Sequence, residues 1–299
     1  MTDPRRSNPA TMALKNRKPS ARHVRDARRP AGPAPHPSGV RESSVRGNRE
    51  IGRRRAECRA PPSGSDKRDT RNSARTGELM KIGIIGAGNI GGNLTRRLTS
   101  LGHEVSVANS RGPETLSALA EETGATPVTV ADAARGAEIV VVTVPLKNVP
   151  DLPAGLFDGA AEGFAVIDTG NYYPKQRDGR IAAIEDEGLT ESRWTQNHLG
   201  HPVVKAFNGT YADDILDKPL PSGAPGRIAV PVAGDDEAAK KAVRDLIDEL
   251  GFDTVDAGGI DESWRQQPNT PVYGLRAGVT AVTQALAEAS PERTADFRG

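Results

Sequence analysis

A glycine-rich turn limits what this chain can fold into more than any other feature. Gly86, Gly88 and Gly91 have the spacing Gly-x-Gly-x-x-Gly, directly after an apolar run at residues 81–86 and before helically spaced apolar residues in 93–98. In a strand-turn-helix unit the first glycine permits a tight turn, the second lets the backbone approach a pyrophosphate, and the third allows close helix packing. Free N–H groups and the dipole at the start of the helix then attract phosphate. The turn therefore predicts a dinucleotide-binding site.

The chain after residue 79 continues this alternation of strands and helices. Strand patterns occur at residues 103–108, 138–143, 164–168, 203–207, 227–232 and 253–256, and helical patterns at 113–122 and 235–250. Strands that alternate with helices form parallel sheets. We predict an α/β fold with a Rossmann-like, doubly wound and mostly parallel sheet. It forms one domain over residues 80–290, with added C-terminal strands and a helix, and a C-terminal tail follows at 291–299.

Residues 1–79 differ sharply from the rest of the chain. They carry 20 Lys and Arg against 8 Asp and Glu, whereas the remainder carries 20 against 31, and all 11 aromatic residues follow residue 150. A segment so poor in apolar residues cannot bury enough surface to offset its chain entropy. We expect it to be disordered, and much of it to precede a true translation start at Met80. It lacks the aromatic residues or amphipathic period of a binding tail, so we predict no nucleic-acid and no membrane partner.

The cysteine content and the length of the longest apolar run indicate which compartment and which metal sites to expect. The single cysteine, Cys58, lies in the basic segment, so the remaining chain has neither a disulfide nor a thiolate metal site. The longest apolar run, at residues 139–144, is far shorter than the roughly 20 residues of a membrane helix. We therefore predict a cytoplasmic protein without a metal site.

The residues at the end of the second predicted strand indicate whether the cofactor is NAD or NADP. An NAD enzyme usually places Asp or Glu there, to accept from the ribose 2′-hydroxyl. This chain has Asn109, Ser110 and Arg111 instead. Ser110 can donate to a 2′-phosphate, and Arg111 can pair with it and stack on adenine. We predict NADP(H) as the cofactor, the alternative for Arg111 being an ordinary solvated loop cation.

Four motifs of the chain together resemble one known family. They are Met80 to Gly91 (MKIGIIGAGNIG), Asn109 to Arg111 (NSR), residues 140–145 (VVVTVP) and residues 203–208 (VVKAFN). This set resembles the NADPH-dependent deazaflavin (coenzyme F-420) reductase family of NADP oxidoreductases, and the related N-terminal domain of eukaryotic metalloreductases. The resemblance implies a Rossmann-like domain that holds NADPH, from which a hydride passes directly to a stacked deazaflavin or flavin ring as second substrate.

The resemblance also implies a role for individual positions. The pyrophosphate would lie against the glycine turn and the start of the following helix, at Gly86, Gly88, Asn89, Ile90 and Gly91. The 2′-phosphate would lie against Asn109, Ser110 and Arg111. Thr143 and Pro145 end a strand where the crevice at the carboxyl ends should receive the ribose and nicotinamide. Asn171 and Asn208 would sit around the reacting ring, the alternative for both being a turn or a helix cap.

Few catalytic side chains are needed when the two ring systems carry the redox chemistry. Of the candidates for an acid or base, His198 and His201 read as surface or capping residues, and Lys205 as a strand lysine that reaches water. We name no catalytic residue and predict an oxidoreductase acting on a small-molecule acceptor. The alternatives are an NADPH-binding redox sensor without turnover and a reductase of a small carbonyl or imine. A C-terminal apolar helical stripe at 275–286 leads us to expect a homodimer.

Overall fold

Strand β1 (Lys81–Ile85) lies inside a six-stranded parallel sheet. The computed structural model describes residues 79–299, and there the sheet has the order β3-β2-β1-β4-β5-β6. The other strands are β2 (Glu104–Ala108), β3 (Thr126–Pro127), β4 (Ile139–Val142), β5 (Ala165–Asp168) and β6 (Val204–Lys205). Because the chain winds outward from β1 in both directions, the carboxyl ends of β1 and β4 meet at the point where the strand order reverses. The predicted doubly wound α/β fold is confirmed.

Strand residues alternate between two apolar cores, one on each face of the sheet. Ile82 and Ile84 of β1 belong to the core that contains α1 (Asn89–Leu101) and α6 (Glu237–Leu250). Ile85 and Val140 belong to the opposite core. Strands buried on both faces are expected to be continuously apolar, as residues 139–142 are.

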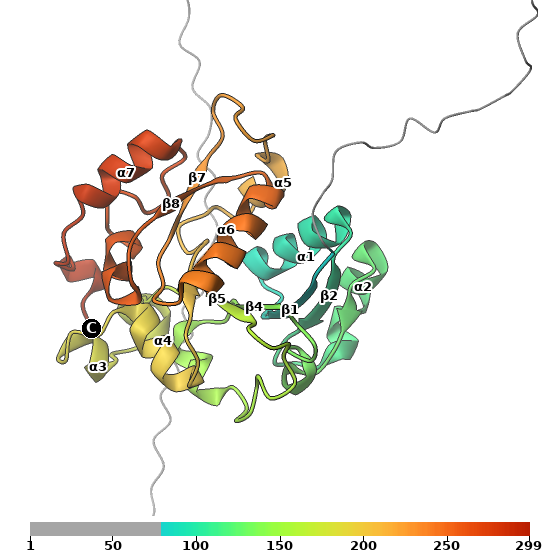
Figure 1. Ribbon diagram of the computed structural model, residues 1–299. Coiled ribbons are helices and arrows are strands. Elements are labelled where there is room, and N and C mark those ends of the chain that lie inside the picture. Colours follow the sequence, from blue (N-terminus) through green and yellow to red (C-terminus); the bar gives the residue numbers. More distant parts are fainter. Residues whose placement is uncertain (1–78) are drawn as a thin grey trace, which may run out of the picture. The chain divides into compact units, whose positions relative to one another are not determined.

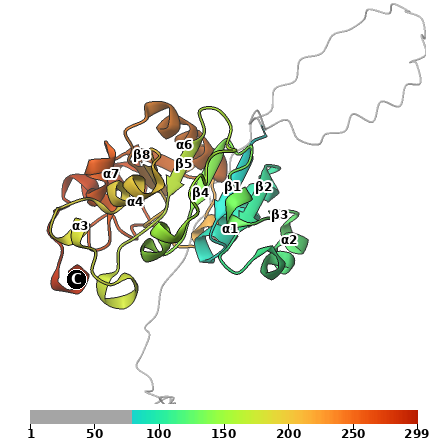
Figure 2. The ribbon, with the colours of Figure 1, turned by 90° about the horizontal axis from the view of Figure 1, so that it is seen from below.

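The added C-terminal strands form a small sheet of their own. Strands β7 (Ala229–Val232) and β8 (Asp253–Asp256) pair in parallel, with α6 as the crossover between them. A single antiparallel bridge between Lys205 and Ala233 joins this pair to β6. Helix α7 (Val279–Ala287) packs on β7 and β8 through a third apolar core. In Figures 1 and 2, α7 and β8 lie at one end of this part of the chain and β2 and α2 at the other, with α6 between them.

Several predicted elements differ from those observed. The predicted helix at 113–122 is a 3-10 turn at Pro113–Leu116 followed by α2 (Ser117–Thr123). The predicted strand at 203–207 shortens to β6 because buried Phe207 adopts a positive φ of 63°, which turns the chain out of the sheet. Helix α4 (Glu191–Leu199) was not predicted at all; Thr190 caps it by accepting from the N–H of Arg193.

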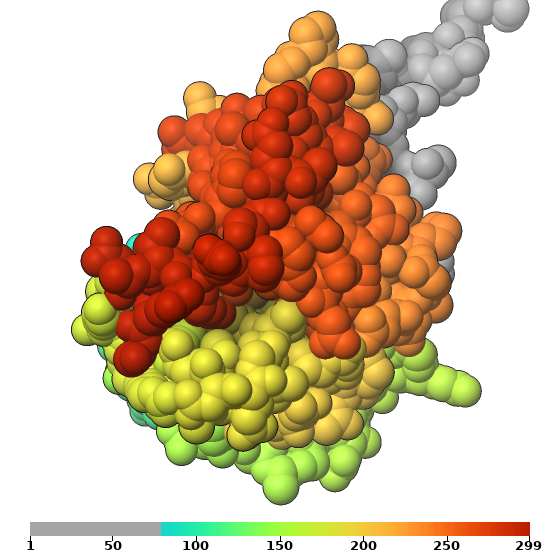
Figure 3. All heavy atoms as spheres, turned by 90° about the vertical axis from the view of Figure 1, so that its left-hand side faces the viewer, coloured from blue at the N-terminus to red at the C-terminus, as the bar shows by residue number. Residues whose placement is uncertain are grey.

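Short elements fill the remaining connections. They are 3-10 turns at Val130–Asp132, Leu146–Asp151, Ile260–Gln266 and Ala295–Phe297, a π turn at Pro174–Asp178, and the helices α3 (Ala182–Glu185) and α5 (Asp214–Asp217). The C-terminal tail lies on the segment after β5: the N–H of Gly299 donates to Glu185, and Lys175 donates to the carbonyl of Ala295. Figure 3 shows these last residues lying on that segment. Residues 1–78, which are all but the last residue of the predicted disordered segment 1–79 and include Cys58, fall outside the described part of the chain.

Candidate dinucleotide site

The three glycines of the turn have separate steric reasons to be glycine. Gly86 has a φ of 110°, and a Cβ atom there would stand 2.3 Å from the carbonyl oxygen of Thr143. A Cβ atom on Gly91 would stand 1.9 Å from the carbonyl oxygen of Gly86. Around Gly88, by contrast, a Cβ atom would meet nothing within 4 Å. The first and third glycines are therefore required by the fold, whereas the space beside Gly88 is open to a ligand.

The start of α1 offers unpaired backbone donors. Gly88 is the N-cap residue and has no side chain to accept from the first turn, which also contains no acidic residue. The first intrahelical bond in this turn runs from the N–H of Gly92 to the carbonyl of Gly88, at 2.7 Å. The N–H groups of Asn89, Ile90 and Gly91 precede it and lack intrahelical acceptors. With the helix dipole uncompensated, this end of α1 fits an anionic group such as a pyrophosphate.

A crevice of about 500 Å³ opens beside this turn at the carboxyl ends of β1, β2 and β4. Its lining includes six of the residues chosen from the sequence: Gly86, Gly88, Asn109, Ser110, Thr143 and Pro145. Val130, Asn148 and Leu152 add lining that the sequence analysis did not select. Asp151 is the sole residue with a titratable side chain among the described residues that line it. The crevice is therefore nearly free of acid or base groups.

The loop after β2 is shaped by Asn109. Its side-chain oxygen accepts from the N–H of Arg111 at 2.8 Å, and its side-chain nitrogen donates to Thr115 Oγ1 at 2.9 Å. Ser110 and Arg111 are exposed, and in the described part of the chain no group pairs with the Arg111 guanidinium. Asn109 thus orders the loop, and Ser110 and Arg111 remain available to a phosphate.

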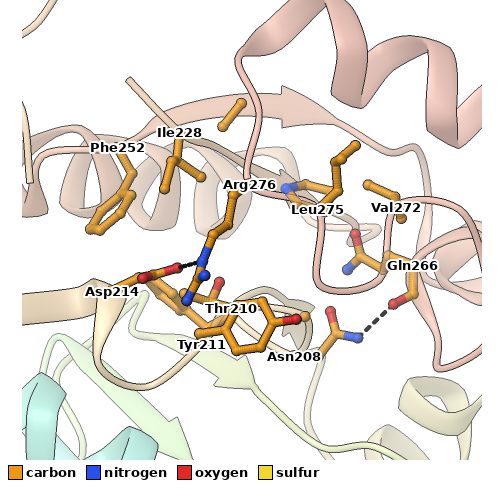
Figure 4. Close-up of a pocket in the computed structure, with 14 residues that line it drawn as sticks. Asn208, Thr210, Tyr211, Asp214, Ile228, Phe252, Gln266, Val272, Leu275 and Arg276 are labelled. Atoms are coloured by element: carbon orange, nitrogen blue, oxygen red, sulfur yellow. Dashed lines mark hydrogen bonds and ion pairs between the residues drawn. The ribbon is translucent and has the colours of Figure 1, made fainter. Parts of the chain in front are cut away.

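Asn171 and Asn208 are brought together but face each other. Asn171 donates to the carbonyl of Asn208 at 2.7 Å, and Asn208 donates to the Asn171 side-chain oxygen at 3.0 Å and to the carbonyl of Gln266 at 2.6 Å. Figure 4 shows the bond from Asn208 to Gln266 at the edge of a second, smaller cavity of about 20 Å³. That volume suits one water molecule. The pair links the loops that follow β5 and β6.

The buried carboxylate of Asp178 joins the loops after β4 and β5. One oxygen accepts from the N–H of Lys147 at 3.3 Å, and the other from the N–H of Tyr173 at 2.8 Å. Arg177 pairs with the same carboxylate at 2.8 Å. Because Lys147 lies between the crevice residues Pro145 and Asn148, this clamp ties the backbone of Tyr173 to a loop that lines the crevice. The sequence analysis missed Asp178, which no local motif marks.

Lys205 is fully buried, so the expectation that it reaches water is wrong. Its ammonium group donates to the carbonyl of Gly170 and to Ser192 Oγ, both at 3.1 Å, and lies 3.4 Å from a carboxylate oxygen of Glu191. Ser192 also donates to Asp168 at 2.6 Å. Glu191 and Ser192 lie on α4, a helix that was not predicted. Their contacts with the ammonium group make the buried position of Lys205 favourable. The cluster fixes the backbone that follows β5.

The histidines serve local structure. Nδ1 of His198 lies 2.9 Å from the carbonyl of Trp194, one turn earlier in α4, and the His201 ring stacks on Phe164. The N–H of Met80 donates to buried His103. In the part of the chain that the structure describes, no group of three or more His, Cys, Asp or Glu residues is placed to hold a metal ion. Nor is any helix there long and apolar enough to cross a membrane.

Residues 81–172 match the model of the family described as NADP oxidoreductase, coenzyme F420-dependent. The matched segment runs from β1 past β5, and so contains the glycine turn, the loop after β2 and the crevice walls at Thr143 and Pro145. The resemblance stated from the sequence motifs is thereby confirmed, as is the class of NADP oxidoreductases.

Two curated relatives match short stretches of the chain. Protein YjhV of Escherichia coli (strain K12) is 56% identical over 54 residues, which cover 18% of this chain and 39% of that protein. Erythronate-4-phosphate dehydrogenase of Salinibacter ruber is 40% identical over 84 residues, which cover 28% of this chain and 21% of that protein. The chain thus matches well under half of the length of these relatives.

Solved structures match over more of the chain. Protein SMa0349 from Sinorhizobium meliloti aligns with a TM-score of 0.56 at 28% identity, covering 68% of this chain and 96% of that one. A candidate F420-dependent NADP reductase from Arthrobacter sp. FB24 aligns with a TM-score of 0.47 at 28% identity, covering 60% of this chain and 86% of that one. The first alignment supports the Rossmann-like fold beyond the family segment.

Proposed function

Since residues 81–172 match a family of NADP oxidoreductases, we propose that the protein transfers a hydride between NADP(H) and a deazaflavin, flavin or similar ring acceptor. One observation carries the proposal. The uncapped start of α1 and the open space at Gly88 adjoin a crevice that also contains Ser110, next to the unpaired Arg111. Donors for two separate phosphate groups therefore lie along one crevice.

The chain's own residues account for the binding of such a cofactor. The N–H groups of Asn89, Ile90 and Gly91 would hold the pyrophosphate, while Ser110 and Arg111 would hold the 2′-phosphate. Thr143 and Pro145 would position the ribose and nicotinamide at the carboxyl end of β4, as the crevice lining suggests. When bound, NADPH supplies the hydride.

The lining of the crevice favours a ring acceptor over a carbonyl substrate. Reduction of a ketone or an aldehyde requires a proton donor close to the substrate oxygen, such as His, Lys or Tyr. None of these types lines the crevice among the described residues, and buried Lys205 is already paired with Glu191. A deazaflavin or flavin needs no such group, because its ring accepts the hydride and can later take a proton from water.

Binding and turnover test the proposal in sequence. The full chain is titrated with NADPH and with NADH by nicotinamide fluorescence, and then a deazaflavin, FMN, FAD or a ferric chelate is added while the nicotinamide absorbance is followed. Tighter binding of NADPH, and oxidation driven by a ring acceptor, are the expected results. Tight binding without turnover by any acceptor would point to a redox sensor. Absence of binding would overturn the proposal at its base.

A further inference from the structure

Two tyrosine hydroxyl groups meet beside the proposed acceptor site. Tyr173 follows β5, Tyr273 follows the 3-10 turn at Ile260–Gln266, and their Oη atoms share a hydrogen bond. Both side chains are half-buried, so each remains partly accessible from outside the protein. The pair is assembled from positions 100 residues apart, so the fold holds it together rather than local sequence.

The hydrogen count of this pair leaves one donor free. Two hydroxyl groups have two hydrogens, and the bond between Tyr173 and Tyr273 uses one of them. In the described part of the chain the structure gives neither hydroxyl group a further hydrogen-bonding partner. The second hydrogen is therefore directed at whatever molecule lies against the pair.

Packing places the pair at the same edge of the sheet as the crevice. Asp178 ties the N–H of Tyr173 to the N–H of Lys147, which lies between the crevice residues Pro145 and Asn148. On the other side, a Cβ atom on Gly209 would stand 3.5 Å from the Tyr273 ring. The pair thus bridges the loops that follow β5 and β6, at the carboxyl edge of the sheet where the crevice also opens.

The surroundings keep the Tyr273 hydroxyl group protonated. Burial, followed by the hydrogen bond with Tyr173, raises the pKa of Tyr273 well above its usual range, and the charge of Glu191 acts in the same direction. The Arg177 guanidinium lies 5.0 Å from the centre of the Tyr173 ring. A phenol that stays neutral near pH 7 keeps its proton and can always donate a hydrogen bond. A group with a pKa of about 7 would be deprotonated part of the time.

We propose that the Tyr173–Tyr273 pair donates a hydrogen bond to the acceptor ring at the atoms where negative charge develops as the hydride arrives. The inference rests on the proposed function. Hydride transfer moves one hydrogen and two electrons to the ring, leaving NADP⁺ and an acceptor anion that then takes a proton from water. A fixed donor aimed at that anion lowers the barrier, because it is already oriented when the charge forms.

Three variants of the full chain test this role: Tyr173→Phe, Tyr273→Phe and the double change. The matched control is Tyr211→Phe. Tyr211 is an exposed tyrosine whose ring lies against the Arg276 guanidinium, and it is not part of the hydroxyl pair. Each protein is assayed for NADPH affinity by fluorescence, for the absorbance change of oxidised FMN or a synthetic deazaflavin on binding, and for kcat with the same two probes.

In the double variant we expect NADPH affinity to stay within twofold of wild type and kcat to fall on the order of 100-fold. The absorbance change of the bound probe should also weaken, a readout that does not depend on turnover. The control should match the wild type in all three assays. Wild-type kcat and an unchanged probe spectrum in the double variant would overturn the inference and leave the proposed function standing. A wild-type chain that neither binds nor reduces either probe would overturn both.

Discussion

The carbonyl oxygen of Gly86 lies 1.9 Å from the position that a Cβ atom would occupy on Gly91. The same Cβ position is 2.8 Å from Thr143 Cγ2, so any side chain on Gly91 would push α1 away from both β1 and β4. Gly88, three residues earlier, has no neighbour within 4 Å of its Cβ position. Gly91 is thus required for packing, whereas we propose that Gly88 is a glycine so that a ligand can approach the backbone.

Alanine at these two positions should separate the reasons. Gly91→Ala overpacks a rigid backbone contact and should lower the free energy of unfolding by about 1–3 kcal/mol or more. Gly88→Ala should cost less than about 1 kcal/mol of stability, yet weaken NADPH binding at least tenfold because the new methyl group occupies the open space. Thermal unfolding and fluorescence titration of both variants measure the two effects. Equal stability losses in the two variants would contradict this assignment.

Arg111→Ala should reduce the preference for NADPH over NADH. Losing a charge-assisted bond to the 2′-phosphate costs about 1.5–3 kcal/mol, which corresponds to roughly tenfold or more in the NADPH dissociation constant. NADH affinity should not change, because NADH lacks that phosphate. Arg244→Ala is the control, since Arg244 is another exposed arginine, on α6. A parallel loss for both dinucleotides would show that Arg111 acts on something other than the 2′-phosphate.

Lys205→Met should strongly destabilise the fold. The change removes the ammonium group between Glu191 and Ser192 and leaves the buried carboxylate of Glu191 with less compensation, a loss of about 3–5 kcal/mol. Lys241→Ala removes an exposed pair with Asp245 and should cost at most about 0.5 kcal/mol. Urea unfolding monitored by circular dichroism compares the two. Similar costs would mean that the buried cluster contributes nothing beyond a surface ion pair.

Stability should fall in acid partly through Asp261. The hydrogen bond from Arg193 lowers the pKa of Asp261 below its ordinary value of 3.8. A carboxyl group with a lower pKa in the folded state stabilises the protein fully above that ordinary value and loses the effect as the pH falls through the folded-state pKa. Asp261→Asn should therefore lower the melting temperature at neutral pH and make little difference at about pH 2. Glu121→Gln, at an exposed position on α2, provides the comparison.

Local sequence was enough to predict the cofactor half of the fold. The glycine turn, β1, β4 and the crevice residues Thr143 and Pro145 are encoded within a few residues each, because spacing and apolar runs determine them directly. Asn109 was selected correctly as part of the loop, but its side chain is used to order that loop.

The loops that follow β5 and β6 depend on contacts that no local sequence pattern encodes. Asp178 reaches back to Lys147, and Tyr273 meets Tyr173 across 100 residues. Lys205 reads as a solvent-facing strand residue until α4 brings Glu191 against it. Such pairings depend on which strands lie side by side in the sheet, so they can be recognised only once the three-dimensional arrangement is known.

Arg293 supplies the fourth charge of the buried cluster around Lys205. Its guanidinium donates to Glu191 at 3.1 Å and to Gln267 at 3.0 Å. Lys205 and Arg293 together balance the two carboxylates of the cluster, those of Asp168 and Glu191. A residue of the C-terminal tail thus completes the charge balance of the interior. A chain without this tail would bury one more carboxylate than its buried cations can balance, which is costly in a low-dielectric interior.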